Sequence, residues 1–236
     1  AQHGEIPPEP DFAVFADTQS ESGYRTRKNP HGEREGLYKW IDWLKEQLSY
    51  PVYEVTAGSL EEACLRERVI KTDAGRRTKG SKYIKQTIPV FGIKDGMKLD
   101  AIGRHCTTDF KVIPCTKKIR EMCKIKRGEK TEIVSQWIGI SKDELQRVKD
   151  SRDPWMVNRY PLLEKRMTRQ NCLEWMSSQN YPTPPRSACF YCPFQRDNEW
   201  RKLRDNHPQD FADAVAFDKK LREKTLAHKT ADGRVL

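Results

Sequence analysis

The first 70 residues alternate between strand and helix patterns, and this alternation is the strongest constraint on the fold. Strand patterns cover 12–16 and 51–55, and helix patterns cover 37–48 and 60–70. Strands that alternate with helices favour an α/β fold in which right-handed crossovers join parallel strands. We therefore predict an open, mainly parallel sheet with flanking helices.

Later segments extend the same pattern. They are strands at 88–93 and 133–140, a turn at 94–96, and a loop followed by a helix over 106–123. Ser141 and Glu144 have the spacing of a capping box, which opens the next helix. We predict that the α/β domain spans residues 1–150.

Residues 151–236 show helical patterns around a cysteine motif. A helix over 168–179 carries Cys172, and a proline-rich linker leads from it to Cys189-Phe-Tyr-Cys192. Apolar residues at helical spacing then indicate a helical hairpin. We predict a small helical C-terminal region that contains the Cys-x-x-Cys motif.

Three of the seven cysteines, Cys172, Cys189 and Cys192, are candidate metal ligands. The candidates for a fourth ligand are, in order, Cys106, Cys115 and Cys123. Four thiolates can hold zinc or a [4Fe–4S] cluster, and spacing does not separate the two. The alternatives are a redox disulfide within the motif, or unliganded cysteines with Cys172 in the core.

The net charge of +10 predicts a polyanionic partner, either a nucleic acid or a phosphate-rich nucleotide. Basic residues gather in 71–85 and 117–130, and the alternative is that they serve solubility alone. No apolar run approaches the ~20 residues of a membrane span. An odd number of unevenly spaced cysteines favours reduced thiols. We therefore expect a cytoplasmic protein without a membrane partner.

Two groups of polar residues are candidate nucleotide contacts. Asp17 and Thr18 follow the first strand, where ligands bind in open α/β sheets, although a helix cap would explain them equally. Arg104, Thr107 and Lys111 are the kind of donors that hold phosphate or sulfate oxygens. A basic helix that faces solvent is the alternative for this second group.

Several of these elements together resemble one family. They are the strand that ends at Asp17 with its following helix, the Cys-Thr-Thr-Asp-Phe-Lys-Val-Ile-Pro segment at 106–114, the strand at 137–140, and the Ser-Ala-Cys-Phe-Tyr-Cys-Pro-Phe motif at 187–194. They are similar to elements of the phosphoadenosine phosphosulfate (PAPS) reductase-like branch of the PP-loop ATP pyrophosphatases, in its phage and bacterial form.

The resemblance implies an adenine nucleotide α-hydrolase-like fold in which ATP activates a substrate or a PAPS-like nucleotide is reduced. Cys106 would be the catalytic thiol. The implied ligands of a [4Fe–4S] cluster or zinc, or sulfur-handling thiols, are Cys106, Cys172, Cys189 and Cys192. The implied nucleotide contacts are Asp17, Thr18, Arg104, Thr107 and Lys111. An adenine nucleotide, DNA or tRNA, and a sulfur donor protein are the implied partners.

Members of this branch carry a Gly/Ser-rich phosphate loop upstream of the strand that matches 12–16. Residues 1–10 contain one glycine and no serine. Without that loop, the backbone N–H groups that cradle pyrophosphate are missing. We expect either a protein that is longer at its amino end, or a member that does not bind ATP in the usual way.

These patterns leave two main functional hypotheses. The first is a PAPS reductase-like enzyme that acts in sulfur transfer or in nucleotide-dependent modification of a nucleic acid. The second is a non-enzymatic nucleic-acid-binding module in which the cysteines hold structural zinc. A degenerate family member that serves as a binding subunit is a third alternative.

Overall fold

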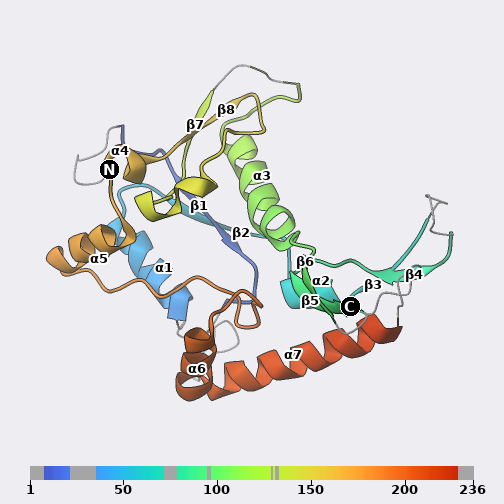
Figure 1. Ribbon diagram of the computed structural model, residues 1–236. Helices are drawn as coiled ribbons and strands as arrows, with labels where there is room; N and C mark the ends of the chain where they lie inside the picture. Colours follow the sequence, from blue (N-terminus) through green and yellow to red (C-terminus); the bar gives the residue numbers. More distant parts are fainter. Residues whose placement is uncertain are drawn as a thin grey trace.

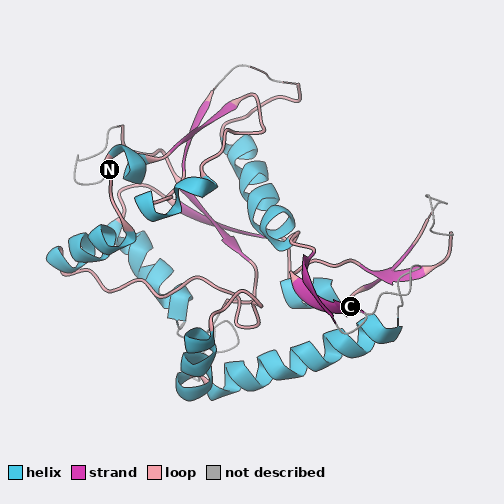
Figure 2. Cartoon of the chain, in the orientation of Figure 1, coloured by secondary structure: helices cyan, strands magenta, loops and turns pink. Residues whose placement is uncertain are grey.

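A computed structural model describes residues 8–21, 36–71, 79–94, 97–128, 130 and 133–227 of the chain. The described part is a mixed α/β structure in which short strand pairs lie among helices (Figures 1 and 2). No helix in these ranges combines the length and the apolar character that crossing a membrane requires.

The predicted strand–helix–strand unit at the start of the chain is confirmed. Strand β1 (Ala13–Asp17) pairs in parallel with β2 (Val52–Thr56), and α1 (Gly36–Gln47) lies between them in sequence. Register is uninterrupted from Ala13 opposite Val52 to Asp17 opposite Thr56. Both strands therefore deliver their carboxyl ends to the same edge, as the sequence predicts.

The other strands do not join this pair into one sheet. They are β3 (Glu67–Val69) with β4 (Lys82–Ile84), β5 (Val90–Lys94) with β6 (Met97–Ile102), and β7 (Val134–Trp137) with β8 (Met156–Arg159). Among the described residues there are thus four two-stranded sheets, and only β1–β2 and β7–β8 are parallel. The α/β class is confirmed at this coarse level, whereas a single open sheet is not formed by the described strands.

Short connections explain this difference. A parallel pair needs a crossover of about a dozen residues or more, whereas β5 ends at Lys94, β6 begins at Met97, and the two strands pair antiparallel. Residues 95–96 of the predicted turn lie outside the described residues. The helix predicted over 60–70 ends early, since α2 spans Leu60–Leu65 and Arg66 is extended. The chain then enters the antiparallel β3–β4 pair. Residues 72–78 of the predicted basic loop lie outside the described residues.

The remaining helices include those that the sequence predicted and one additional short helix, α4 (Pro161–Glu164), that it did not predict. In chain order they are η1 (Thr108–Val112), α3 (Ile113–Met122), η2 (Lys142–Arg147), α4, α5 (Arg169–Ser178), α6 (Asp197–Asn206) and α7 (Pro208–Ala227). Helix α3 packs against β1 and β2, and α6 and α7 form the predicted hairpin (Figure 1). The capping box predicted at Ser141 is wrong, because its side chain caps no helical N–H and η2 is a 3-10 helix.

Two apolar clusters form the core. The larger one joins α2 and Phe110 of η1 to the aromatic pair of the Cys-x-x-Cys motif and to the α6–α7 hairpin. The smaller one gathers Trp155 and Met156 against α3. The β7–β8 pair spans the domain boundary predicted at residue 150. The larger cluster thus unites the two predicted regions around the carboxyl end of β1.

Candidate functional site

The carboxyl end of β1 carries polar residues that the fold buries. The Asp17 carboxylate is 8% exposed and accepts hydrogen bonds from the Tyr38 hydroxyl and the Gln19 amide, each at 2.7 Å. Thr18 is fully buried, and its carbonyl accepts the Leu60 amide at 3.1 Å. Two helices, α1 and α2, are therefore tied to this strand end. The sequence singled out Asp17 and Thr18 but gave no sign of Tyr38.

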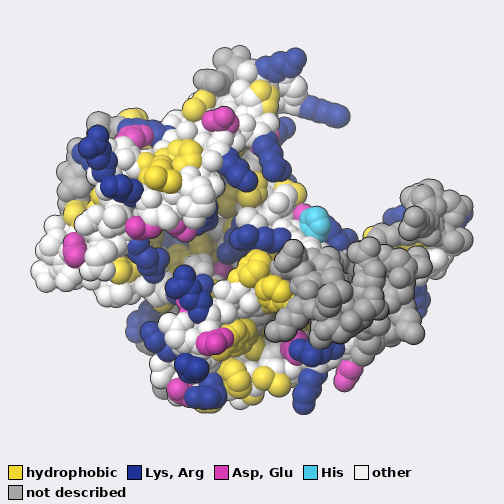
Figure 3. All heavy atoms as spheres, viewed as in Figure 1, with side chains coloured by type: hydrophobic (Ala, Val, Ile, Leu, Met, Phe, Trp, Pro, Cys, Tyr) yellow, Lys and Arg dark blue, Asp and Glu magenta, His cyan; other side chains and the backbone are white. Residues whose placement is uncertain are grey.

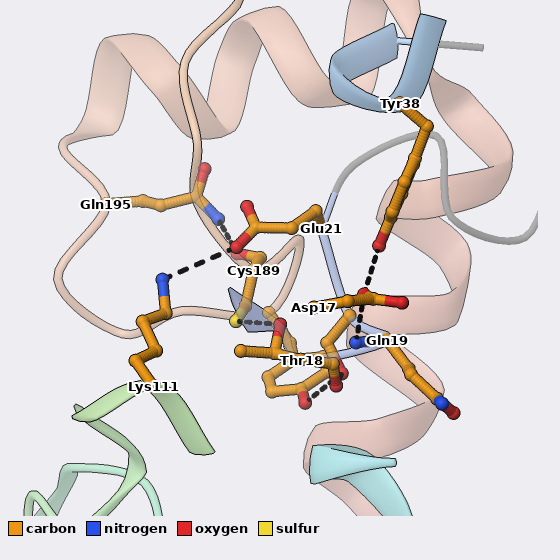
Figure 4. A network of polar contacts seen from close by, with 10 residues as sticks. Asp17, Thr18, Gln19, Glu21, Tyr38, Lys111, Cys189 and Gln195 are labelled. Carbon is orange, nitrogen blue, oxygen red and sulfur yellow. Dashed lines mark hydrogen bonds and ion pairs between the residues drawn. The ribbon is translucent and has the colours of Figure 1, made fainter. Parts of the chain in front are cut away.

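The Cys-x-x-Cys loop is bonded to the same strand end. Glu21 and Cys189 form an isolated antiparallel bridge, and the Phe190 amide donates to the Ser20 carbonyl at 3.0 Å. The Tyr191 hydroxyl donates to Ser20 Oγ at 2.7 Å, in a buried contact. Residues 171 positions apart in sequence are thus held side by side, as Figure 4 shows for Thr18 and Cys189.

The same bridge brings a thiol to the buried hydroxyl of Thr18. Cys189 Sγ lies 3.7 Å from Thr18 Oγ1, and the Cys192 amide donates to the Cys189 carbonyl at 3.0 Å. The Gln195 side chain donates to the Cys189 and Phe190 carbonyls at 3.2 and 3.0 Å. The loop is therefore fixed by its own hydrogen bonds, with Cys189 on its inner side.

Glu21 is a buried carboxyl that the sequence analysis missed. It is 1% exposed, its Oε1 lies 3.5 Å from Lys111 Nζ, and its Oε2 has no hydrogen-bond partner among the described residues. Burial raises the pKa of Glu21 above its ordinary value, although the Lys111 ammonium acts to lower it. The only sequence signal was a carboxylate four positions beyond Asp17.

Cys189 holds its proton firmly in this setting. Burial, reinforced by the neighbouring Glu21 carboxylate, raises the pKa of the Cys189 thiol to about 12. The Lys111 ammonium and the Thr18 hydroxyl oppose this increase. A neutral thiol is a weak nucleophile, so a ligand or base that removes its proton would switch its reactivity on.

The predicted phosphate contacts divide between two places. Lys111 extends from η1 to Glu21, whereas the exposed Arg104 places its guanidinium carbon 5.1 Å from the centre of the Phe194 ring. Thr107 is exposed at the start of the same helical segment. Cys106 is half-buried, and its amide donates to the Thr87 carbonyl at 2.8 Å. The structure thus brings Lys111 to the β1 end and sets Arg104 beside the cysteine loop.

The four predicted thiolate ligands are not gathered at one point. Cys172 lies on α5, where burial raises its pKa with Asp143 and Arg169 as charged neighbours. Cys106 instead borders the larger apolar cluster, beside Cys64. No group of three or more His, Cys, Asp or Glu residues in the described ranges is placed to hold a metal ion. This arrangement of thiols does not fit a four-thiolate cluster.

Comparisons with known protein families, with characterised proteins and with solved structures gave no significant match to this chain. The site is therefore interpreted from its own residues.

Proposed function

We propose that the chain is a PAPS reductase-like enzyme, with the adenine nucleotide α-hydrolase-like fold, that acts in sulfur transfer or nucleotide-dependent modification of a nucleic acid. One observation carries the proposal. The β1 end, the 106–114 segment and the Cys-x-x-Cys loop, which the sequence analysis singled out separately, meet at Thr18, Lys111 and Cys189. Ligands of open α/β sheets bind at such strand ends.

Lys111, Glu21 and Cys189 each have a part in the proposed reaction. Lys111 is 40% exposed and carries the positive charge that a phosphate or sulfate oxygen would contact. The approach of the phosphate or sulfate group would draw the Lys111 ammonium away from Glu21. The Glu21 carboxylate would then be ready to accept a proton. Glu21 is the bridge neighbour of Cys189 and is therefore the base placed to generate the thiolate. No step of the proposal depends on a metal or a cluster.

Titration calorimetry of the full chain with ATP and with PAPS tests the proposal. We expect one of them to bind, and we expect Lys111→Met to weaken binding at least about tenfold, since it removes a charge-assisted contact. Lys118→Met is the matched control, because Lys118 lies on α3 and pairs with Glu121. Absence of binding by both nucleotides, in a protein whose circular dichroism shows it folded, would sink the proposal.

A second candidate function is a non-enzymatic nucleic-acid-binding module. The surface in Figure 3 favours it, because Lys and Arg side chains surround the hollow on the face shown there. A net charge of +10 adds long-range attraction to a polyanion. Nucleic-acid affinity that falls steeply with salt, together with stoichiometric zinc and no nucleotide binding, would favour this module over the enzyme.

A further inference from the structure

Two phenylalanine rings are exposed side by side next to the Cys-x-x-Cys loop. Phe91 on β5 is 57% exposed, and Phe194, two positions after Cys192, is 42% exposed. Their ring centres are 6.1 Å apart, with an interplanar angle of 81°. Segments about a hundred residues apart in sequence therefore build one small aromatic surface, which we call the Phe91–Phe194 surface.

Arg104 adds a cation to this surface. Its guanidinium carbon lies 5.1 Å from the centre of the Phe194 ring, and no carboxylate of the described residues forms an ion pair with it. The preceding Gly103 has φ of +71°, and a Cβ there would lie 2.5 Å from Gln86 Cγ. A glycine is therefore required for the turn that presents Arg104 beside the ring.

The exposure of these rings is unfavourable, because the free energy falls when an apolar side chain leaves water. The structure packs other aromatic residues of the same loop tightly: Phe190 and Tyr191 are 3% and 4% exposed. Phe194 and Phe91 are instead left accessible at the surface. The two rings meet edge to face and Arg104 lies over the Phe194 ring, so a flat partner would stack on the ring surface that these contacts leave exposed.

We infer that the Phe91–Phe194 surface, together with Arg104, binds an unpaired base of a single-stranded nucleic acid. Exposed aromatic rings combined with basic side chains are how proteins hold single strands, since bases stack on the rings while cations contact the backbone. Charge complementarity favours this occupant over an apolar protein segment, because the chain carries +10 and Arg104 has no carboxylate partner in the described structure.

The inference deepens the proposed function by naming its substrate class, and it rests on that function for the chemistry. Phe194 follows Cys192 closely, so a base stacked there would lie beside the cysteine loop that borders Thr18 and Glu21. A duplex presents its bases edge-on within a stack. A single strand, or a base turned out of a duplex, is therefore the form that the rings can hold.

Fluorescence anisotropy with a labelled single-stranded oligonucleotide of about 12 nucleotides tests the inference. We expect Phe91→Ala and Phe194→Ala each to weaken binding about 5- to 150-fold, which is the usual loss of affinity when an aromatic ring that stacks on a base is removed. We expect Phe194→Trp to retain binding, because its ring still stacks. Leu145→Ala is the matched control: Leu145 is 56% exposed on η2, and its loss should leave binding unchanged.

An abasic oligonucleotide of the same length separates stacking from backbone contact. We expect the two alanine variants to bind it as the unmodified protein does, since it lacks the bases that stack. Arg104→Ala should lower the slope of log affinity against log salt by roughly 0.7 for a single strand. The inference fails if the alanine variants bind the normal oligonucleotide unchanged, or if they lose the normal and abasic probes equally.

The same samples are titrated with ATP and PAPS, so the two proposals can fail separately. A protein that binds a nucleotide but no single strand overturns the inference alone. A protein that binds the single strand through Phe91 and Phe194, but binds no nucleotide, retains the inference and overturns the proposed chemistry.

Discussion

Glu21 is a carboxyl that the fold removes from water without giving it full hydrogen-bonding compensation. Its Oε2 has no hydrogen-bond partner among the described residues, and the carboxyl interacts with the Ser187 side chain and with Lys111, which is itself 40% exposed. An ionised carboxylate in such a place costs stability, and the raised pKa of Glu21 expresses this cost. A residue kept under these conditions is available for proton transfer.

Replacing Glu21 should change how stability depends on pH. The folded pKa lies above the unfolded one, so this group's stabilisation is present below the unfolded pKa and is lost as pH rises through the folded pKa. We expect Glu21→Gln to remove this loss. Urea denaturation at about pH 5 and about pH 8 should show that the free energy of unfolding of the native protein falls relative to that of the variant as pH rises. Each unit by which the folded pKa exceeds the unfolded pKa corresponds to a fall of about 1.4 kcal/mol.

Glu46→Gln, at an exposed position on α1, is the control and should follow the native protein. An identical pH dependence in the native protein and in Glu21→Gln would contradict the prediction.

The thiol of Cys189 should react slowly with alkylating reagents. At about pH 8, a pKa of about 12 leaves roughly a thousandfold less thiolate than the pKa of 9.0 of an unperturbed cysteine would, and alkylation requires the thiolate. Mass spectrometry after timed iodoacetamide treatment should find Cys192 modified well before Cys189. In the protein without a bound nucleotide, where Lys111 still pairs with Glu21, Glu21→Gln should accelerate the alkylation of Cys189, because the carboxylate charge that raises the pKa of this thiol is gone. Equal rates at Cys189 in the two proteins would argue against this coupling.

Helices and strands with strong local signals were predictable from the sequence. The β1–α1–β2 unit combines apolar strand patterns with a helix of apolar periodicity, and the expected elements formed. Helix α5 was predicted over 168–179 and begins after Thr168, a favoured cap residue. Local preference and tertiary contacts agree in these segments.

Pairing and burial were not predictable in the same way. Strand pattern alone does not say whether β5 pairs with β1 or folds back on β6, since the pattern specifies neither the partner strand nor its direction. Glu21 offered no apolar signal, because its burial comes from the Cys189 loop, which lies 168 positions away in sequence. Candidate site residues near β1 were therefore only partly identifiable, and their long-range partners required the structure.

The capping box at the start of α5 should contribute to stability at the scale of one element. Thr168 Oγ1 accepts the Asn171 amide at 3.2 Å, and Asn171 Oδ1 accepts the Thr168 amide at 3.0 Å. We expect Thr168→Ala to lower the free energy of unfolding by about 1 kcal/mol in urea denaturation. Thr168→Ser keeps the hydroxyl and should retain most of the stability. If Thr168→Ser lowers the free energy of unfolding as much as Thr168→Ala does, the stabilisation comes from the methyl group of Thr168 and not from the hydroxyl cap.

Across the whole molecule, one apolar cluster links the beginning of the chain to its end. Phe217 of α7 is 3% exposed and stacks 4.2 Å from the Tyr191 ring centre, while Tyr191 bonds to Ser20 beyond β1. Helix α7 also packs against α2. The C-terminal hairpin is therefore part of the support of the site, and the site depends on contacts that close long loops.

This sharing of one cluster predicts a single cooperative unfolding transition. We expect Phe217→Ala to lower the free energy of unfolding by about 3–5 kcal/mol, because it removes a buried ring and leaves a cavity beside Tyr191. Val215→Ala is the control on the same helix, since Val215 is 42% exposed and its replacement should cost little stability.

Circular dichroism and tryptophan fluorescence in urea should give coincident unfolding curves for all three proteins, since a lost contact in a shared core weakens every element packed on it. Separate transitions in the Phe217→Ala variant, with the early part of the chain unaffected, would instead show that the hairpin folds independently and that β1 holds its polar residues without it.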